Sequence, residues 1–96
     1  MKTRIIGLIQ FQDTSAFEHY RARVGATVEA FGGCVSFRGQ HLETYWNELG
    51  CAPFDAVVEL QFPDADCARQ WRDSPAYQAL LNIRSQAMRL TLFAAE

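Results

Sequence analysis

Arg38 and Glu59 are residues whose types could hold a small acid and move a proton. Arg38 falls near the end of a predicted strand, on its less apolar face, where a guanidinium can fork onto a carboxylate or phosphate. The same arginine can instead pair with Glu59 across the sheet or with a partner subunit. Glu59 is out of phase with the apolar face of its strand. Buried in a dimer it would act as a base, and exposed it would form a salt bridge or contact water.

His19 and His41 are the only imidazoles of the chain. A metal site usually needs three or more ligands with regular spacing, so the sequence predicts no metal and no haem. His41 follows the Arg38-Gly39 bend and can reach the mouth of a pocket, which makes it the better candidate for proton transfer. The other interpretation of His41 is a surface histidine. The cysteines, widely spaced and without a Cys-x-x-Cys pair, indicate neither a disulfide framework nor a zinc site, so we expect no cofactor.

Aromatic side chains are expected on the inner faces of two helices, looking at the sheet. Tyr20, Trp71 and Tyr77 hold these positions, and plain core packing is one interpretation, most of all for Trp71. A buried tyrosine must satisfy its hydroxyl, so Tyr20 and Tyr77 are either hydrogen-bonded in the core or line a cavity. Arg84 either complements the end of its helix or points into the same cavity. No Ser-His-Asp arrangement, phosphate loop or dinucleotide fingerprint is present.

The first half of the chain reads as strand, helix and strand. Residues 4–11 are apolar on both alternating faces, which is typical of a strand covered on both sides. A helix follows, capped by Asp13 or Ser15, with an apolar stripe from Phe17 to Phe31 and an end at Gly32-Gly33. Its opposite face, which carries Arg21, should meet water. Residues 34–38 alternate as a strand, with Val35 and Phe37 on one face and Arg38 on the other, and the extended pattern can continue to residue 45.

The second half repeats this order after a loop at residues 47–53. Residues 55–62 form a strand, and Pro63-Asp64 ends it and caps the next helix. Ser74-Pro75 breaks and restarts this helix, because serine suits the cap and proline the first helical position. Tyr77, Leu80, Leu81 and Arg84 then follow at near-helical spacing, so the restarted helix is expected to reach Arg84. Residues 88–93 form the last strand. The order βαββαβ predicts an α+β fold, a single ferredoxin-like sandwich over residues 1–96, with a four-stranded antiparallel sheet and helices on one face.

The composition limits the partners of this domain. The formal charge is −2 with one lysine, so an electrostatic footprint for nucleic acid is missing. The apolar runs are too short to span a membrane, and with no export signal we expect a cytoplasmic protein. The second sheet face is partly apolar in every strand. A partner subunit is the simplest cover for it, so we expect a homodimer whose sheets pack face to face.

Several short motifs together resemble one family over nearly the whole chain. The Ser-Pro-x-Tyr-Gln element after an aromatic is the most specific, and the set is Phe17-Glu18-His19-Tyr20, Phe31-Gly32-Gly33, Phe37-Arg38-Gly39, Leu60-Gln61-Phe62-Pro63, Trp71, Ser74-Pro75-Ala76-Tyr77-Gln78 and Arg84. The chain resembles the domain-of-unknown-function thirteen-thirty family, within the dimeric α/β-barrel superfamily. It departs from the family pattern at Gln40, where a second glycine is usual, and at Gln61, where an acid is usual. An apolar residue is common at the position of Glu59.

The resemblance implies a ferredoxin-like dimer whose relatives include cofactor-free monooxygenases, chlorite dismutase-like haem proteins and muconolactone isomerases. One hypothesis is therefore a cofactor-independent enzyme acting on a small, anionic molecule. Arg38 would bind the substrate, His41 or Glu59 would move a proton, and Tyr20, Tyr77, Trp71 and Arg84 would line the cavity. The alternative is a non-catalytic ligand-binding or dimerisation module. A continuous cavity lined by Arg38 and a tyrosine hydroxyl favours the first, and a packed interior favours the second.

Overall fold

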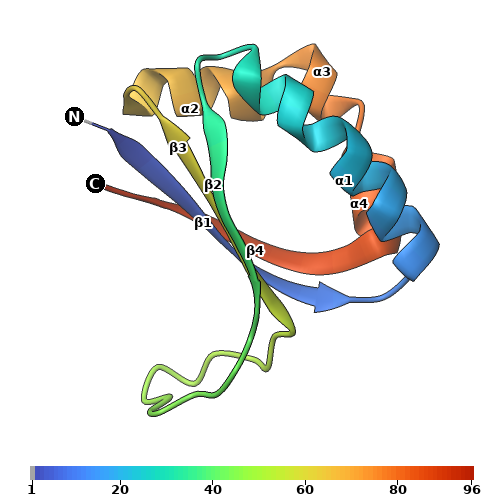
Figure 1. Cartoon of the computed structure of the whole chain (residues 1–96), viewed down its shortest axis with the longest axis vertical. Coiled ribbons are helices and arrows are strands. Elements are labelled where there is room, and N and C mark those ends of the chain that lie inside the picture. Colours follow the sequence, from blue (N-terminus) through green and yellow to red (C-terminus); the bar gives the residue numbers. More distant parts are fainter. Residues whose placement is uncertain (1) are drawn as a thin grey trace.

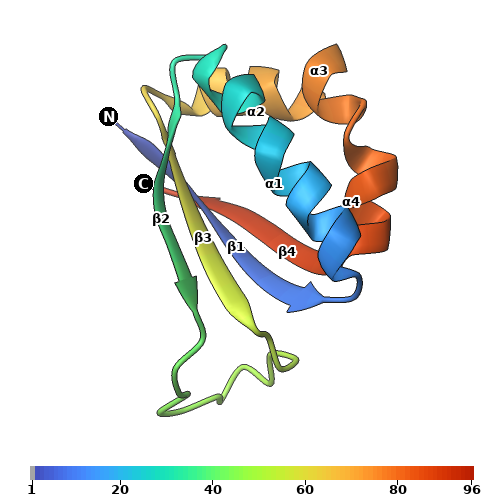
Figure 2. The same cartoon turned by 45° about the vertical axis from the view of Figure 1, so that its right-hand side comes forward.

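The computed structural model describes residues 2–96, which form four strands and four helices (Figure 1). The strands are β1 (Thr3–Phe11), β2 (Cys34–Gln40), β3 (Ala56–Phe62) and β4 (Met88–Ala95). The helices are α1 (Thr14–Glu29), α2 (Ala65–Asp73), α3 (Pro75–Gln78) and α4 (Leu81–Ala87). The sheet is antiparallel, in the order β2-β3-β1-β4, and the helices lie on one face of it (Figure 2). The predicted ferredoxin-like α+β fold is confirmed, and the strand ends differ from the prediction by at most two residues.

Helix α1 begins and ends as its sequence indicates. Of the two candidate caps, Asp13 is used, and its carboxylate accepts a hydrogen bond from the backbone N–H of Ala16 at 3.0 Å. The stripe that includes Tyr20, Val24 and Val28 is buried against the sheet. Gly32, with φ of +79°, turns the chain toward β2 in a conformation that disfavours any residue with a side chain.

The helical segment between β3 and β4 is broken twice, once where the sequence predicted a break and once where it did not. Ser74 ends α2 by donating to the Trp71 carbonyl at 2.8 Å, and its oxygen caps α3 by accepting from the Tyr77 N–H at 3.2 Å. The helix was predicted to continue from there to Arg84. Instead α3 ends at Gln78, and the chain turns before α4 begins at Leu81. This turn lets α4 run beside α1 (Figure 2).

A β-bulge in β2 changes which face Arg38 occupies. Val35 pairs with Leu60 and Arg38 pairs with Val58, with the register shifting between Val35 and Phe37. Leu60 and Val58 share the face toward the helices, so Val35 and Arg38 share it too. The predicted alternation, which put Arg38 opposite Val35, is wrong because one extra residue at the bulge reverses the phase of the strand.

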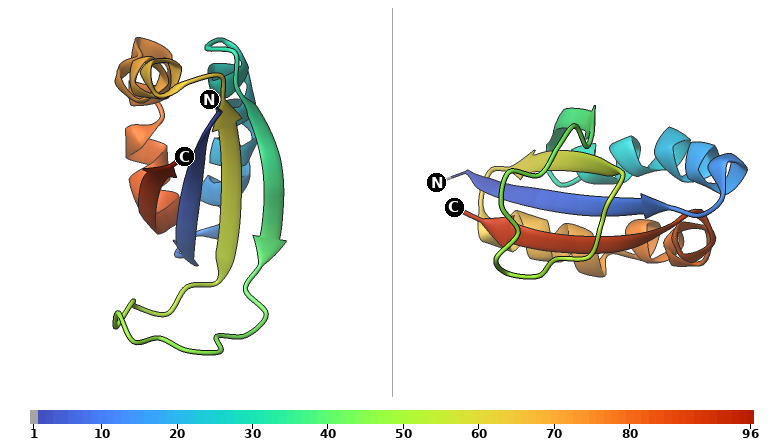
Figure 3. Two further views of the ribbon diagram at one scale, coloured as in Figure 1. Left: turned by 90° about the vertical axis from the view of Figure 1, so that its left-hand side faces the viewer. Right: turned by 90° about the horizontal axis from the view of Figure 1, so that it is seen from below.

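The other face of the sheet has no helix over it (Figure 3). It carries apolar side chains from all four strands, among them Phe37, at 54% exposure, and Phe93, at 46%; the others are Ile6, Leu8 and Val57. The β2–β3 loop, residues 41–55, projects beyond this face (Figure 1). The pattern allowed the strand to continue to residue 45, but β2 ends at Gln40. None of the helices among residues 2–96 has the length and apolar character needed to cross a membrane.

Candidate ligand-binding site

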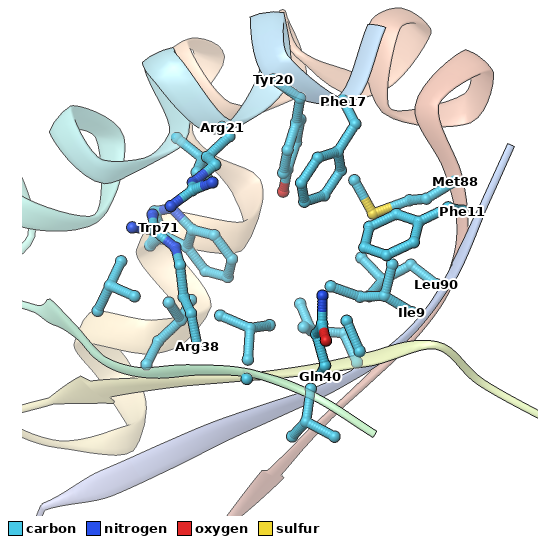
Figure 4. Close-up of a pocket in the computed structure, with 18 residues that line it drawn as sticks. Ile9, Phe11, Phe17, Tyr20, Arg21, Arg38, Gln40, Trp71, Met88 and Leu90 are labelled. Atoms are coloured by element: carbon cyan, nitrogen blue, oxygen red, sulfur yellow. The ribbon is translucent and has the colours of Figure 1, made fainter. Parts of the chain in front are cut away.

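A cavity of about 270 Å³ lies between the helices and the sheet (Figure 4). Most of its wall is apolar, and α1, α2 and all four strands contribute to it: Ile9, Phe11, Phe17, Tyr20, Arg21, Val24, Val35, Arg38, Gly39, Gln40, Ala56, Val57, Val58, Leu60, Trp71, Met88, Leu90 and Leu92. The exposed members of this wall are Phe11, Arg21, Arg38 and Gln40. The mouth therefore lies between α1 and the edge strand β2. An apolar cleft with a few polar groups is the usual form of a small-molecule site.

Gly7 lies beneath two residues of the cavity wall, Val58 and Leu92. A Cβ atom there would lie 2.7 Å from Cγ1 of Val58 and 3.0 Å from Cδ1 of Leu92. The side chains of the two neighbouring strands therefore close over the glycine. Any larger residue at position 7 would push Val58 and Leu92 into the cavity, since real Cβ atoms do not approach carbon so closely.

A hydrogen-bonded chain of three side chains stands behind the cavity. The Tyr20 and Tyr77 hydroxyl oxygens lie 2.9 Å apart, and Nη1 of Arg84 donates to the Tyr77 oxygen at 2.8 Å. Tyr20 lines the cavity, whereas Tyr77 lies behind it and is 2% exposed. Both alternatives for the tyrosines hold in part: they are bonded to each other in the core, and one of them reaches the cavity.

The direction of these hydrogen bonds follows from counting donors. The Arg84 guanidinium only donates, so the Tyr77 oxygen accepts from it. The Tyr77 hydroxyl hydrogen is buried and needs an acceptor, and the Tyr20 oxygen is the one at hand. The Tyr20 hydrogen is then free to point into the cavity. Burial, followed by the neighbouring Tyr77, raises the pKa of Tyr20 far above its usual range. Tyr20 is therefore a neutral hydrogen-bond donor.

Trp71 joins the cavity to the packed core. Its Nε1 donates to the Thr27 hydroxyl at 3.1 Å, which in turn donates to the Val24 carbonyl at 2.7 Å. The ring lies 5.5 Å from that of Phe62 and 4.3 Å from that of Tyr77, measured between centroids. With its polar atom satisfied, Trp71 offers only ring surface to the cavity. Trp71 therefore packs in the core and also forms part of the cavity wall.

Two arginines stand at the mouth. Arg38 rises from β2 and Arg21 descends from α1, and their guanidinium groups point toward one another (Figure 4). Within residues 2–96 neither forms an ion pair or a side-chain hydrogen bond. Glu59, considered above as a partner for Arg38, is on the outer face of the sheet, 3.4 Å from Arg4.

The two residues expected to move a proton lie outside the cavity wall. Glu59 is separated from it by the sheet, and Gln61 donates to its carboxylate at 3.2 Å. His41, just beyond β2, hydrogen-bonds the Thr44 hydroxyl at 2.8 Å and packs edge-on against Phe54. In the described part of the chain, the cavity wall includes no aspartate, glutamate, histidine, cysteine or lysine. The proton-transfer roles of His41 and Glu59 stay predictions.

Arg84 lines a second hollow, separate from the first cavity. This hollow lies beside the β2–β3 loop and the start of β4, and its wall includes Gln10, Pro53 and Arg89. Arg84 therefore contacts the first cavity only through Tyr77 and Tyr20. Its guanidinium carbon also lies 5.7 Å from the centre of the Tyr77 ring.

The family follows from a match over the whole described chain. The family model with the description "Domain of unknown function (DUF1330)" matches residues 2–96. The chain belongs to this family. Among curated proteins, none matches it.

Solved structures share the fold of this DUF1330 protein at low sequence identity. A protein of unknown function from Rhodopseudomonas palustris, RPA0582, has a TM-score of 0.79 at 17% identity, covering 98% of this chain and 80% of that one. A dimeric ferredoxin-like protein of unknown function from Thermobifida fusca has a TM-score of 0.65 at 19% identity, over 99% and 90%. SnoaB, a cofactor-independent oxygenase from Streptomyces nogalater, has a TM-score of 0.71 at 12% identity, over 99% and 91%.

Sequence reasoning missed part of this DUF1330 cavity. Arg21 was assigned to the water-facing side of its helix and is exposed, as expected; its place on the cavity wall was missed, and it follows from the position of Arg21 beside the buried stripe, one residue after Tyr20 and three before Val24. That flanking position was the available signal. Phe17 was seen only as a core residue, and Gln40 only as a departure from the family pattern.

Proposed function

We propose that this DUF1330 protein binds a small molecule in the cavity between its helices and its sheet. The observation that carries the proposal is an apolar cavity of about 270 Å³ that has Arg38 at its mouth and the Tyr20 hydroxyl on its wall. A non-catalytic dimerisation module has no need of such a space, because an unfilled core loses packing energy. The combination favours an apolar molecule with an acidic group.

The test fills or enlarges the cavity at one position. Val58→Phe adds bulk to the wall, and Val58→Ala is the matched variant that leaves more room. We expect fragments that bind the wild type, detected by NMR, to bind Val58→Ala and to lose affinity for Val58→Phe by about tenfold or more. Circular dichroism and the Tm check that both variants fold. Equal binding to the two variants would place the ligand elsewhere.

A second candidate, favoured by the likeness to SnoaB, is cofactor-independent oxygenation. Without a cofactor, the electrons that reduce oxygen must come from the substrate, and an electron-rich anion gives them most readily. The neutral Tyr20 donor and the Arg38 charge would stabilise a substrate oxyanion at the reacting end. Since the wall supplies no base, this candidate requires a substrate that is itself acidic.

Oxygen uptake tests this candidate. An electrode records consumption with electron-rich phenols as the substrates, for wild type, Tyr20→Phe and Arg38→Gln. The oxygenase predicts uptake that rises with wild-type concentration and falls at least about tenfold in each variant. Uptake no greater than with heat-denatured protein would reject oxygenation for these phenols and leave the binding proposal standing.

We also infer that the protein is a homodimer that packs its outer sheet faces together. That face exposes Phe37 and Phe93, and the β2–β3 loop exposes Leu42, Tyr45, Trp46 and Leu49 at 76–93%. Apolar surface of this extent on a small domain is typical of an interface. The loop projects past the same face, where it can pack on a second copy (Figure 1). The structural likeness to a dimeric ferredoxin-like protein supports a second copy as the occupant.

Sedimentation decides the oligomeric state. A dimer at micromolar concentration is expected for the wild type, and Phe93→Glu should shift it toward monomer, because a charge would be buried at the interface. His19→Glu, on an exposed site of α1, is the control and should leave the dimer intact. A stable wild-type monomer would contradict the inference.

A further inference from the structure

The mouth of the cavity brings together two positive charges, neither of which forms an ion pair within residues 2–96. Arg21 and Arg38 come from different elements, both line the cavity, and their guanidinium groups point toward one another (Figure 4). The chain carries more acidic than basic residues, 11 against 9, so carboxylates are not scarce. Three of these carboxylates pair with other arginines: Glu59 with Arg4, Asp66 with Arg69 and Asp73 with Arg72.

Convergence distinguishes this pair from an ordinary exposed arginine. Arg23, two residues further along α1, also forms no ion pair in the described chain, but it does not line the cavity. Two like charges that point at one another repel, and a bound anion replaces that repulsion with two attractions. Guanidinium groups also present planar sets of donors that match a carboxylate.

The β-bulge in β2 explains how the Arg38 side chain reaches the mouth of the cavity. With unbroken alternation Arg38 would lie on the outer face of the sheet, with Phe37 toward the helices. The bulge between Val35 and Phe37 reverses this and aims Arg38 at α1. Bulges recur next to binding sites because they redirect a side chain in this way.

We propose that Arg21 and Arg38 form a clamp for the carboxylate of an amphipathic monoanion. This rests on the proposed binding function and adds to it a second binding residue and the place of the acidic group. The carboxylate lies at the mouth between the guanidinium groups, and the apolar body extends inward along Val24, Val35 and Leu60. The Tyr20 hydroxyl donates to a polar atom further in, where the ligand has one.

Matched acids and amides test the clamp. The probes are benzoate, 3-phenylpropanoate and hexanoate, each beside its neutral amide, with affinities measured by NMR titration. The two members of each pair have nearly the same shape, but only the acid carries a negative charge. We expect the acid that binds best to exceed its amide by about tenfold at low salt, and this preference to shrink as salt is added, because the mouth is exposed to solvent.

Variants separate the clamp from the cavity. Arg21→Gln and Arg38→Gln should each lower the affinity of the acid several-fold, and the double variant should remove the preference while the amide binds as before. Arg23→Gln is the control on the same helix and should retain the wild-type preference. Loss of acid preference in Arg38→Gln but not in Arg21→Gln would overturn the two-arginine clamp.

The two proposals fail in different ways. If acids and amides bind equally, and Val58→Phe weakens both, the cavity is a ligand site and the clamp is wrong. If an acid is preferred but Val58→Phe leaves its affinity unchanged, the anion sits outside the cavity and the clamp is again wrong. If no acid or amide binds at millimolar concentration, both the clamp and the cavity as a site for such molecules are rejected.

Discussion

The two ends of the layer between helices and sheet are built very differently. At the closed end, where β2 begins and β3 ends, Phe62, Val28 and Tyr77 are at most 2% exposed. At the open end, where β2 ends and β4 begins, the same layer leaves the cavity with Arg21 and Arg38 at its mouth. Trp71 stands between them. The closed end holds the fold together and lets the open end remain unfilled, as a binding site requires.

The largest effect is expected from emptying the closed end. Phe62→Ala removes a ring that is 1% exposed and packs against Trp71. Such truncations cost about 3–5 kcal/mol, which is much of the stability of a domain this size. Urea unfolding measures the loss. A cost below about 1 kcal/mol would mean that the closed end is not the main source of stability.

A methyl group added at the closed end should also lower the stability of the fold. In Gly33→Ala the new Cβ would lie 2.7 Å from the Phe62 ring and 2.9 Å from the Gln61 carbonyl oxygen, so about 1–3 kcal/mol of stability is lost. Gly25→Ala, inside α1 with nothing within 4 Å, is the matched control. It should gain about 0.5–1 kcal/mol because alanine favours the helix. Equal Tm shifts for the two would contradict the tight packing at Gly33.

The hydroxyl chain between the two ends should matter at an intermediate level. Tyr77→Phe keeps the ring but leaves Arg84 without its acceptor and the Tyr20 oxygen without its donor, at a cost of about 1–3 kcal/mol. Tyr20→Phe should cost less, because it breaks one of these hydrogen bonds instead of two. Urea unfolding of both variants compares them, and the reverse order would contradict the central position of Tyr77 in this hydrogen-bonded chain.

The buried Tyr20 hydroxyl in this hydrogen-bonded chain predicts that the stability of the fold depends on pH in the alkaline range. Burial raises the pKa of Tyr20 in the folded state above its value of 10.0 in the unfolded state. The unfolded chain then loses its proton first, so the stabilisation is complete below about pH 10 and declines as the pH rises beyond it. Tyrosinate absorbance should show one residue that resists ionisation until unfolding, and Tyr20→Phe should remove that delayed step. A Tyr20→Phe titration identical to wild type in shape would contradict this.

The smallest effect on stability is expected at the mouth. Arg38→Gln changes an exposed side chain without a partner in the described chain, so the free energy of unfolding should move by no more than about 0.5 kcal/mol. The same variant should weaken acid binding. A large loss of stability would make Arg38 part of the scaffold, and the contrast between the two ends would fail.

Local signals in the sequence predicted most of this architecture. Asp13, Gly32 and Ser74-Pro75 act within a few residues of their own position, so the helix ends and the break after Asp73 could be predicted. The bulge near Ser36 could not, since it depends on how β2 pairs with β3. For the same reason Arg38 was chosen correctly as a residue of interest but placed on the wrong face.

The site itself was predictable only in part. Tyr20, Trp71 and Arg38 were expected at a cavity and line it. Tyr77 and Arg84 were expected there too, but they reach the cavity only through hydrogen bonds that lead to Tyr20. Their distance from the cavity depends on the turn between α3 and α4, which the sequence did not predict. Arg21 was missed because a residue that flanks a helical stripe can face either solvent or a cavity mouth.

Fragment binding followed by NMR tests the central claim most directly. The claim is that the open end admits a small molecule while the closed end stays packed. Spectra recorded with small aromatic acids should show shifts at Tyr20, Val24, Val35 and Leu90 and at the Trp71 indole, with Val28 and Gly33 unchanged, and Val58→Phe should abolish them. Shifts confined to the outer sheet face, or shifts that persist in Val58→Phe, would contradict the account.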